Sequence, residues 1–379
     1  MRSARSLIPL VILGLLHAYI GGRVLPNLPV SAAFQWLGAA VLVLSVLTIP
    51  LGTMSRSFAN HPWLQRLSVL GLFMMGLFSS LLVFTLLRDI ALGVITPFVS
   101  ASTLHPVIQV SASAVVIVST FATLMGLIGA RRIARVVNVD VPIANLPSAL
   151  HGFTIAQISD IHVGLTIKRN YVDGIVNAVN GLRPDLIAVT GDVVDGSVRD
   201  LAPHTEPLKR LSAKHGTYVV TGNHEYYSGE RAWTAEFERL GLRVLMNEHI
   251  VLTHEGAQLV IAGVADYGAH HFNPAQRSDP KAALKDAPTH VSPRILLAHQ
   301  PRSAIAAADA GFDLQLSGHT HGGQFWPWNH FVRFQQPFTA GLHKLQNLWI
   351  YISRGTGYWG PPNRFGAPSE ISRIRLVPA

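Results

Sequence analysis

The pattern of hydrophobic positions along this 379-residue chain changes once, close to residue 135. Before that point apolar residues form four long runs, and after it short apolar runs alternate with polar clusters. The four runs are Leu7–Gly22, Ala32–Met54, Leu67–Leu87 and Val110–Ala130. About 20 apolar residues in a helix cross the hydrocarbon core of a bilayer. The pattern therefore predicts that residues 1–135 form an all-α region with four transmembrane helices.

The first run is the least certain span, because it is short and contains Pro9 and His17. It is also compatible with a signal peptide, although no small-x-small cleavage site follows it. The other three runs are longer and carry no charge. For these three, buried helices of a soluble core are the weaker interpretation.

The arginines of the first 135 residues predict an orientation, because positive charge accumulates on the cytoplasmic side of a membrane. With four spans and a cytoplasmic N-terminus, the outside loops carry only Arg23 and Arg88. The inside segments carry Arg2, Arg5, Arg56, Arg66, Arg131, Arg132 and Arg135. We therefore expect a multi-pass protein of the inner (cytoplasmic) membrane, with its C-terminal domain in the cytoplasm. If the first run does not cross, the same bias still favours this side for that domain.

The second half of the chain shows the pattern of an α/β domain. Residues Val136–Ile143 alternate as an exposed or edge strand does, and Pro142 fits an edge. Helical stretches such as Tyr171–Leu182 and Arg231–Leu240 separate short apolar runs, each of which ends in a polar cluster. These runs are Phe153–Ile158, Leu186–Val189, Thr217–Val220, Ile295–Ala298 and Asp313–Leu316. Ligands of open α/β sheets gather at the carboxyl ends of the strands, so we expect a layered sandwich with a site at one edge.

Composition limits the possible partners and ligands. The net charge of +9 resembles that of a nucleic-acid-binding protein, but residues 1–135 hold nine arginines and a single acid, Asp89. The remaining residues are nearly neutral, so no nucleic acid is expected as a partner. The chain has no cysteine, which excludes disulfides and thiolate ligands. A transition metal would have to be bound by His, Asp and Asn.

Five polar clusters follow the predicted strands in order. They are Asp160-Ile161-His162, Gly191-Asp192-Val193-Val194-Asp195, Gly222-Asn223-His224-Glu225, His299, and Gly318-His319-Thr320-His321. Each cluster alone is compatible with an ordinary turn or helix cap. The last is the most specific, because imidazoles two residues apart on a strand point the same way. Together the clusters supply carboxylate, amide and imidazole donors for two adjacent divalent cations, an arrangement suited to in-line displacement at phosphorus.

This order of motifs resembles the calcineurin-like metallophosphoesterase superfamily. The tail Ser353–Gly357 and Pro362–Ile371 resembles its bacterial membrane-associated branch of the YkuE/YaeI type. The resemblance covers residues 136–379 and implies a layered α/β/β/α sandwich, preceded here by the four-helix transmembrane segment.

The resemblance also implies roles for individual residues. Asp160, His162 and His321 would bind one metal, Asn223, His299 and His319 the other, and Asp192 would bridge both. His224 would act on the substrate as a catalytic residue, with Asp195 and Glu225 orienting this shell, and Arg354 is a candidate substrate ligand. The donor set suits Mn, Fe, Zn or similar ions.

The leading hypothesis is a membrane-anchored phosphodiesterase or pyrophosphatase that uses hydroxide generated between the metals. Its partners would be the lipid bilayer and a lipid-linked or envelope-related phosphoester. Two alternatives stay open: a phosphatase or nucleotidase for soluble substrates, and a metal-binding membrane scaffold without catalysis.

Overall fold

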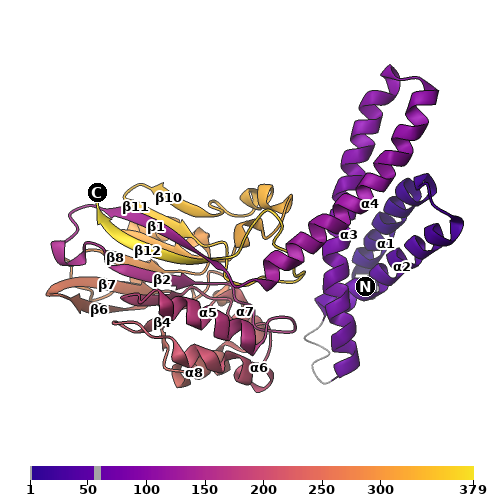
Figure 1. Ribbon diagram of the computed structural model, residues 1–379. Helices are drawn as coiled ribbons and strands as arrows, with labels where there is room; N and C mark the ends of the chain where they lie inside the picture. The colour runs from indigo at the N-terminus through magenta and orange to yellow at the C-terminus, as the bar shows by residue number, and fades with distance from the viewer. Residues whose placement is uncertain (1, 55–60) are drawn as a thin grey trace. The chain divides into compact units, whose positions relative to one another are not determined.

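The computed structural model describes residues 2–54 and 61–379 (Figure 1). The chain forms two compact units. The first, which we call the membrane unit, comprises Met1–Ile128 together with the short segment Gly360–Phe365. The second, the catalytic unit, comprises Gly129–Trp359 and Gly366–Ala379.

The membrane unit is built of helices. They are α1 (Arg2–Val24), α2 (Ala32–Thr53), α3 (Pro62–Ile95) and α4 (Ala101–Arg131), the last of which runs on into the catalytic unit. All four are long and apolar enough to cross a membrane by length and composition. Helices α3 and α4 extend beyond the apolar runs 67–87 and 110–130, because a helix satisfies its own backbone and can continue past the apolar run that drives insertion. Arg56, which the orientation prediction uses, lies outside the described residues.

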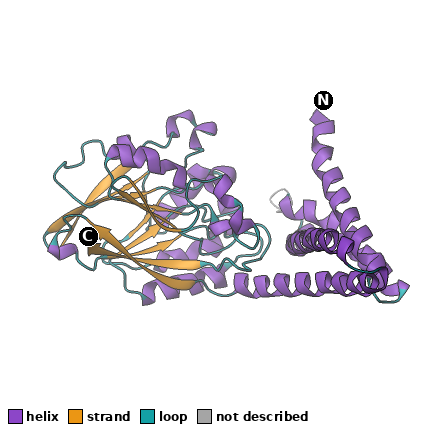
Figure 2. Ribbon diagram, turned by 90° about the horizontal axis from the view of Figure 1, so that it is seen from above, coloured by secondary structure: helices purple, strands orange, loops and turns teal. Residues whose placement is uncertain are grey.

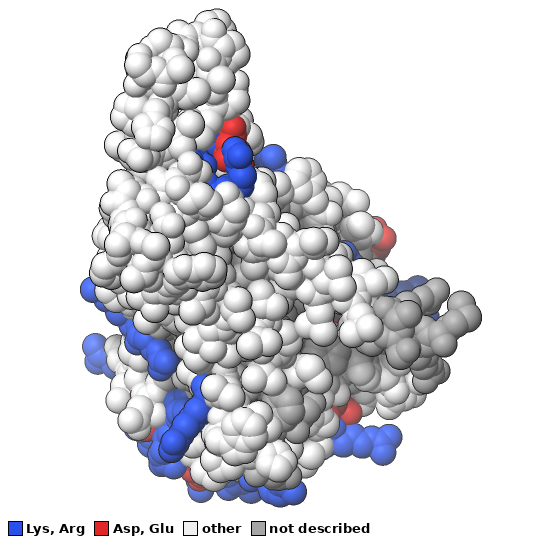
Figure 3. All heavy atoms as spheres, turned by 90° about the vertical axis from the view of Figure 1, so that its right-hand side faces the viewer, with Lys and Arg blue, Asp and Glu red and all other residues white. Residues whose placement is uncertain are grey.

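A polar cluster joins three helices of this unit. The guanidinium of Arg23 donates to both carboxylate oxygens of Asp89, over 2.7 and 3.0 Å, and the hydroxyl of Tyr19 donates to the same carboxylate. Arg88, whose side chain is only 3% exposed, donates to Asp89, to Ser111 Oγ and to a carbonyl of α4. Most of the helical surface in Figure 3 is uncharged by contrast.

The segment Gly360–Phe365 packs inside the membrane unit although it lies close to the C-terminus. Its Asn363 and Arg364 are buried, and the backbone N–H of Arg364 donates to the carbonyl of Gly126 in α4 at 3.0 Å. A Cβ added to Gly126 would overlap the Asn363 amide. The sequence-based division of the chain at residues 135 and 136 does not anticipate this excursion.

Two six-stranded sheets form the centre of the catalytic unit. The first has the order β1 (Arg135–Ile143), β12 (Glu370–Pro378), β2 (Thr154–Ile158), β3 (Leu186–Val189), β4 (Thr217–Val219) and β5 (Arg243–Val244). The second has the order β10 (Gly341–Leu345), β11 (Leu348–Ile352), β9 (Leu314–Ser317), β8 (Arg294–Leu297), β7 (Ala257–Gly263) and β6 (Glu248–His254). The prediction that Val136–Ile143 is an edge strand is confirmed.

Apolar side chains fill the space between the sheets and cover their outer faces. Ile155, Leu186 and Tyr218 of the first sheet meet Ile295 and Leu316 of the second in one buried cluster. On the outer face of the first sheet lie α5 (Arg169–Gly181), α6 (Val198–Thr205) and α8 (Glu230–Arg239), and on that of the second α9 (Pro280–Ala283) and α10 (Ala304–Ala310). Figure 2 shows the strands enclosed by helices. The predicted α/β/β/α layering is confirmed.

The sheet topology brings the polar clusters together. Strands β2, β3 and β4 are parallel neighbours in the first sheet, and β7, β8 and β9 are parallel neighbours in the second. The carboxyl ends of parallel neighbours lie at the same edge of a sheet. The residues that follow β2, β3, β4, β8 and β9 therefore meet at one place.

Candidate metal centre

The first group of donors combines two residues that follow β2 with one residue that follows β9, more than 150 positions later in the chain. One ligand atom each from Asp160, His162 and His321 lies within 4.8 Å of the others, and all three residues are buried. Nε2 of His321 is 3.0 Å from Nε2 of His162 and 3.5 Å from Oδ1 of Asp160. This arrangement suits one cation with mixed oxygen and imidazole ligands.

Asp192, His299 and His319 form a second group, in which one ligand atom from each residue also lies within 4.8 Å of the others. Nε2 of His299 lies 3.1 Å from Oδ2 of Asp192 and 3.2 Å from Nδ1 of His319. The same Oδ2 atom of Asp192 is 4.0 Å from Nε2 of His162, which belongs to the first group. Asp192 therefore lies between the two groups, where a bridging carboxylate has to be.

Asn223 contributes an amide oxygen to this region. It is the first residue of helix α7 (Asn223–Ser228), which follows strand β4 in the chain. Its Oδ1 atom is shielded from solvent and accepts no hydrogen bond from the described residues. A shielded, unsatisfied oxygen costs free energy unless a ligand satisfies it. The donor set therefore fits a second cation.

The backbone at these positions is unusual. Five of the seven predicted ligands have positive φ angles; these are Asp160, His162, Asp192, His319 and His321, with φ between 51° and 72°. Residues other than glycine adopt this region rarely and at a cost, and such residues cluster at functional sites. The positive φ angles bend the loops that follow the strands, and the side chains of these residues come together in the two groups.

Hydrogen bonds from outside the two groups fix the donors. Nδ1 of His299 lies 2.8 Å from the carbonyl of Thr190, and this contact fixes the ring with Nε2 toward Asp192. The carboxylate of Glu225 accepts the backbone N–H groups of Gly222, Asp192 and Val193, over 2.7 to 3.0 Å. A Cβ on Gly222 would collide with the Asp192 carboxylate, so glycine is required for this close approach.

Burial and charge adjust the ionisation of the donors. Burial, followed by the neighbouring His299, lowers the pKa of His319 to about 3. Burial raises the pKa of Asp192, but His299 and His224 outweigh it and hold that pKa well below its usual range. A neutral imidazole and an ionised carboxylate are the forms that bind metals. Burial lowers the pKa of His299, but the neighbouring Asp192 outweighs it and holds that pKa well above its usual range, so metal binding here would displace a proton from His299.

His224 and Asp195 lie beside the two groups. Nδ1 of His224 is hydrogen-bonded to Oδ1 of Asp195, and Nε2 of His224 is 4.0 Å from Oδ2 of Asp192. Burial raises the pKa of Asp195, but contacts with His162 and His224 lower it further than burial raises it. Asp195 is therefore an anion that orients the ring of His224.

Arg354 takes part in an ion pair on the catalytic unit. Its Nη1 atom donates to Oε2 of the buried Glu370 over 3.0 Å, and 40% of its side chain is exposed. Its aliphatic stem packs where Gly322 leaves room. The exposed part of Arg354 is compatible with the predicted substrate contact, which stays a prediction.

The expectation about His319 and His321 is wrong in its geometry. Strand β9 ends at Ser317, so neither histidine lies on a strand. The left-handed backbone between them sends His319 to Asp192 and His321 to Asp160. Sequence reasoning also missed Tyr227, whose ring lies beside His224, and Phe272, whose ring lies beside Tyr227. The spacing of Tyr227 three residues after His224 on a helix was the available signal.

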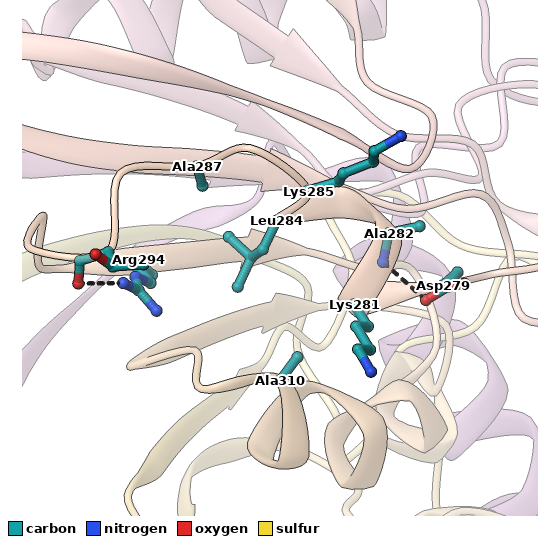
Figure 4. Close-up of a pocket in the computed structure, with 9 residues that line it drawn as sticks. Asp279, Lys281, Ala282, Leu284, Lys285, Ala287, Arg294 and Ala310 are labelled. Carbon is teal, nitrogen blue, oxygen red and sulfur yellow. Dashed lines mark hydrogen bonds between the residues drawn. The ribbon is translucent and has the colours of Figure 1, made fainter.

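A separate cavity of about 560 Å³ lies at α9 and the loop that follows it (Figure 4). Lys281, Lys285 and Arg294 are among its nine lining residues, and Arg294 donates to the carbonyl of Thr289. None of the nine is a predicted ligand. This cavity does not belong to the candidate metal centre.

The chain is similar in sequence to known metallophosphoesterases. Residues 153–323 match the family model described as calcineurin-like phosphoesterase. A Bos taurus protein named transmembrane protein with metallophosphoesterase domain is 37% identical over 276 residues, which cover 70% of this chain and 62% of that protein. The Bacillus subtilis (strain 168) protein named uncharacterized metallophosphoesterase YkuE is 30% identical over 244 residues, 61% of this chain and 81% of the relative.

The chain thus spans less than two thirds of the bovine relative. Among solved structures, Haemophilus influenzae NAD nucleotidase matches with a TM-score of 0.39 and 16% identity, over 54% of this chain and 51% of that one. Such a low score carries no conclusion about activity.

Proposed function

The chain belongs to the calcineurin-like phosphoesterase family, a family of metal-dependent phosphoester hydrolases, and from this premise we propose that it is a membrane-anchored phosphoesterase with two metal ions. The bond that it hydrolyses is a phosphodiester or a pyrophosphate. The observation that carries the proposal is the position of Asp192 between two groups of donors, within 3.1 Å of His299 and 4.0 Å of His162.

The residues divide between the metals as their contacts suggest. Asp160, His162 and His321 would hold one ion, Asn223, His299 and His319 would hold the other, and Asp192 would serve both. Two bound divalent cations of the Mn, Fe or Zn type supply Lewis acidity, which neutralises the phosphoryl oxygens and makes water a better nucleophile. The orphaned oxygen of Asn223 supports the second ion independently of the histidines.

His224 is placed to move a proton. Asp195 holds the proton on Nδ1, so that Nε2 faces the region of Asp192. Water adds to phosphorus as the ester P–O bond breaks, and the leaving oxygen takes up the proton that His224 carries on Nε2. The negative charge of Asp195 stabilises the protonated ring before the transfer.

The membrane unit suggests where the substrate is found. Four helices of spanning length precede the catalytic unit, and the arginine distribution favours a cytoplasmic position of that unit at the inner membrane. A lipid-linked or envelope-related phosphoester would be available there.

Full-length protein, purified and supplied with Mn²⁺, should hydrolyse bis-p-nitrophenyl phosphate. Asp192→Ala and His224→Ala should each reduce this to background. Asp140→Ala serves as the matched control, because Asp140 lies on the edge strand β1 and forms an exposed pair with Arg375. Full activity of the Asp192→Ala protein would refute the proposed mechanism.

A comparison of substrates separates the lipid-linked class from soluble phosphomonoesters. Nucleoside monophosphates and phospholipid phosphoesters are offered to the same protein at equal concentration. Preference for the nucleotides would contradict the lipid-linked class and leave the hydrolase assignment standing.

A further inference from the structure

Three large aromatic side chains lie half exposed in this region: Tyr227 and Trp359 beside His224, and Phe272 beside Tyr227. Tyr227 is 52% exposed, Phe272 53% and Trp359 53%. Neighbouring apolar side chains left in water mark a surface that a ligand or partner covers. We call these three residues the aromatic wall.

The rings of the wall are connected to the catalytic histidine. The ring centroid of His224 is 5.3 Å from that of Tyr227 and 5.8 Å from that of Trp359. The ring of Phe272 lies 5.6 Å from Tyr227 and extends the wall away from His224. The wall therefore begins at the residue that faces the leaving oxygen.

The fold holds each ring in place. Tyr227 follows His224 by three residues on α7. The backbone of Trp359 makes two hydrogen bonds of 2.8 Å with the side-chain amide of Gln324, which directly follows the loop of His319 and His321. The backbone N–H of Phe272 donates to the carbonyl of Ala269, whose side chain packs against the buried Tyr226.

A hollow continues from the far end of the wall. Its volume is about 600 Å³, and Phe272, Tyr226 and Pro274 are among the residues that line it. An extended substituent that passes Trp359 and Tyr227 would reach this hollow at Phe272. This hollow thus has an apolar part at Phe272, and Glu230, Arg231 and Gln276 supply polar groups on its lining.

We propose that the aromatic wall binds an alkyl or acyl chain carried by the leaving group of the phosphoester. This inference rests on the proposed hydrolase function and adds the class of the substrate. The mutual orientation of the rings favours a chain over a flat ring. The ring planes cross at 66° for His224 and Tyr227, 77° for His224 and Trp359, and 62° for Tyr227 and Phe272.

Tilted rings offer no pair of parallel faces between which a base or an aryl group could stack. A flexible chain, by contrast, adjusts its torsions to a tilted surface and gains from each methylene that leaves water.

Alkylphosphonates test the proposal without any turnover. They are not hydrolysed, and their head group binds the metal centre while the chain samples the wall. The dissociation constants of methyl-, propyl- and hexylphosphonate are measured by calorimetry on full-length, Mn-loaded protein in nanodiscs. We expect affinity to rise about twofold per methylene, half the effect of complete burial, or about 30-fold from methyl to hexyl.

Variants show whether the wall causes this gain. Trp359→Ala, Tyr227→Ala and Phe272→Ala should each reduce the ratio of methyl to hexyl dissociation constants, and the triple variant should bring it to about threefold or less, while the constant for methylphosphonate stays within about twofold of wild type. Trp359→Phe should restore part of the ratio. Phe334→Ala is the matched control, since Phe334 is 74% exposed and is not part of the wall.

Three outcomes would overturn the inference. They are a wild-type ratio near one, a triple variant that keeps the wild-type ratio, and phenylphosphonate binding more tightly than hexylphosphonate in a wall-dependent way. Failure of the proposed function looks different: the Mn-loaded wild type would bind no methylphosphonate and hydrolyse no phosphoester.

Discussion

The carboxylate of Asp195 holds Nδ1 of His224, and this single hydrogen bond determines which nitrogen of the ring faces Asp192. The contact joins two motifs that lie 29 positions apart in the chain. An imidazole held at one nitrogen by a carboxylate has a fixed tautomer and orientation at the other. We therefore expect the pair to act on the proton rather than to bind the metals.

Asp195→Asn tests this division of labour. The amide preserves the shape but removes the charge that stabilises protonated His224, so we expect kcat to fall by about 10² or more. Metal content, measured by inductively coupled plasma mass spectrometry, should not change. A variant that loses metal together with activity would mean that Asp195 supports the metal centre instead. Asp140→Asn provides the matched control.

Asn223→Leu should remove one of two metal equivalents. Leucine is branched at Cγ as asparagine is but carries no oxygen, and Oδ1 of Asn223 has no hydrogen-bond donor among the described residues. We expect the metal stoichiometry after dialysis to fall from two towards one. Asn177→Leu, at an exposed position where the amide pairs with Arg210, should keep both equivalents. Retention of two equivalents by the Asn223 variant would contradict the role of this amide.

Gly126→Ala should destabilise the membrane unit. The added methyl group would overlap the Asn363 side chain, and overpacking of this kind costs about 1–3 kcal/mol. Thermal unfolding in detergent measures the effect. Gly93→Ala is the matched control, because a Cβ at this position on α3 meets nothing within 4 Å. Equal melting temperatures of the two variants would argue against close packing of Asn363 on α4.

Asp89→Asn should destabilise the same unit for an electrostatic reason. Arg88 is buried and would lose its counter-charge, and an uncompensated buried charge costs about 3–5 kcal/mol. Arg23→Gln should cost much less, because the Arg23 side chain is half exposed to solvent. The order of the two melting temperatures is the measurement, and the reverse order would show that Arg23 carries the network.

The orientation of the protein is open to direct labelling, because the chain contains no cysteine. Single variants Phe98→Cys, between α3 and α4, and Lys344→Cys, on β10, can be treated with a membrane-impermeant thiol reagent on intact cells. We expect Phe98→Cys to react at once and Lys344→Cys only after permeabilisation. The opposite pattern would place the catalytic unit outside.

The strands and the order of the clusters could be predicted because each depends on local sequence. The run Leu186–Val189 is β3 itself, and the polar residues directly after it need no long-range information. The arrangement of His319 and His321 could not be derived in the same way. Their opposite directions arise from positive φ angles, which tertiary contacts impose and which remain uncommon for any residue except glycine.

Two members of the aromatic wall, Tyr227 and Phe272, could not be predicted, for a related reason. Tyr227, Phe272 and Trp359 come from three distant segments, and only the folded chain brings their rings within 6 Å of one another or of His224. Each looks like an ordinary core residue in the sequence, since aromatic residues are usually buried. Their exposure is the informative property, and it exists only in the structure.

The segment Gly360–Phe365 affects how the catalytic unit can be expressed without the membrane unit. A protein that starts after the last helix would still carry these six residues, with Asn363 and Arg364 stripped of the surroundings that bury them. In such a fragment the segment directly after Trp359 would be exposed to solvent, and we expect it to promote aggregation. Detergent extraction of the intact chain is therefore the safer route to crystals than truncation.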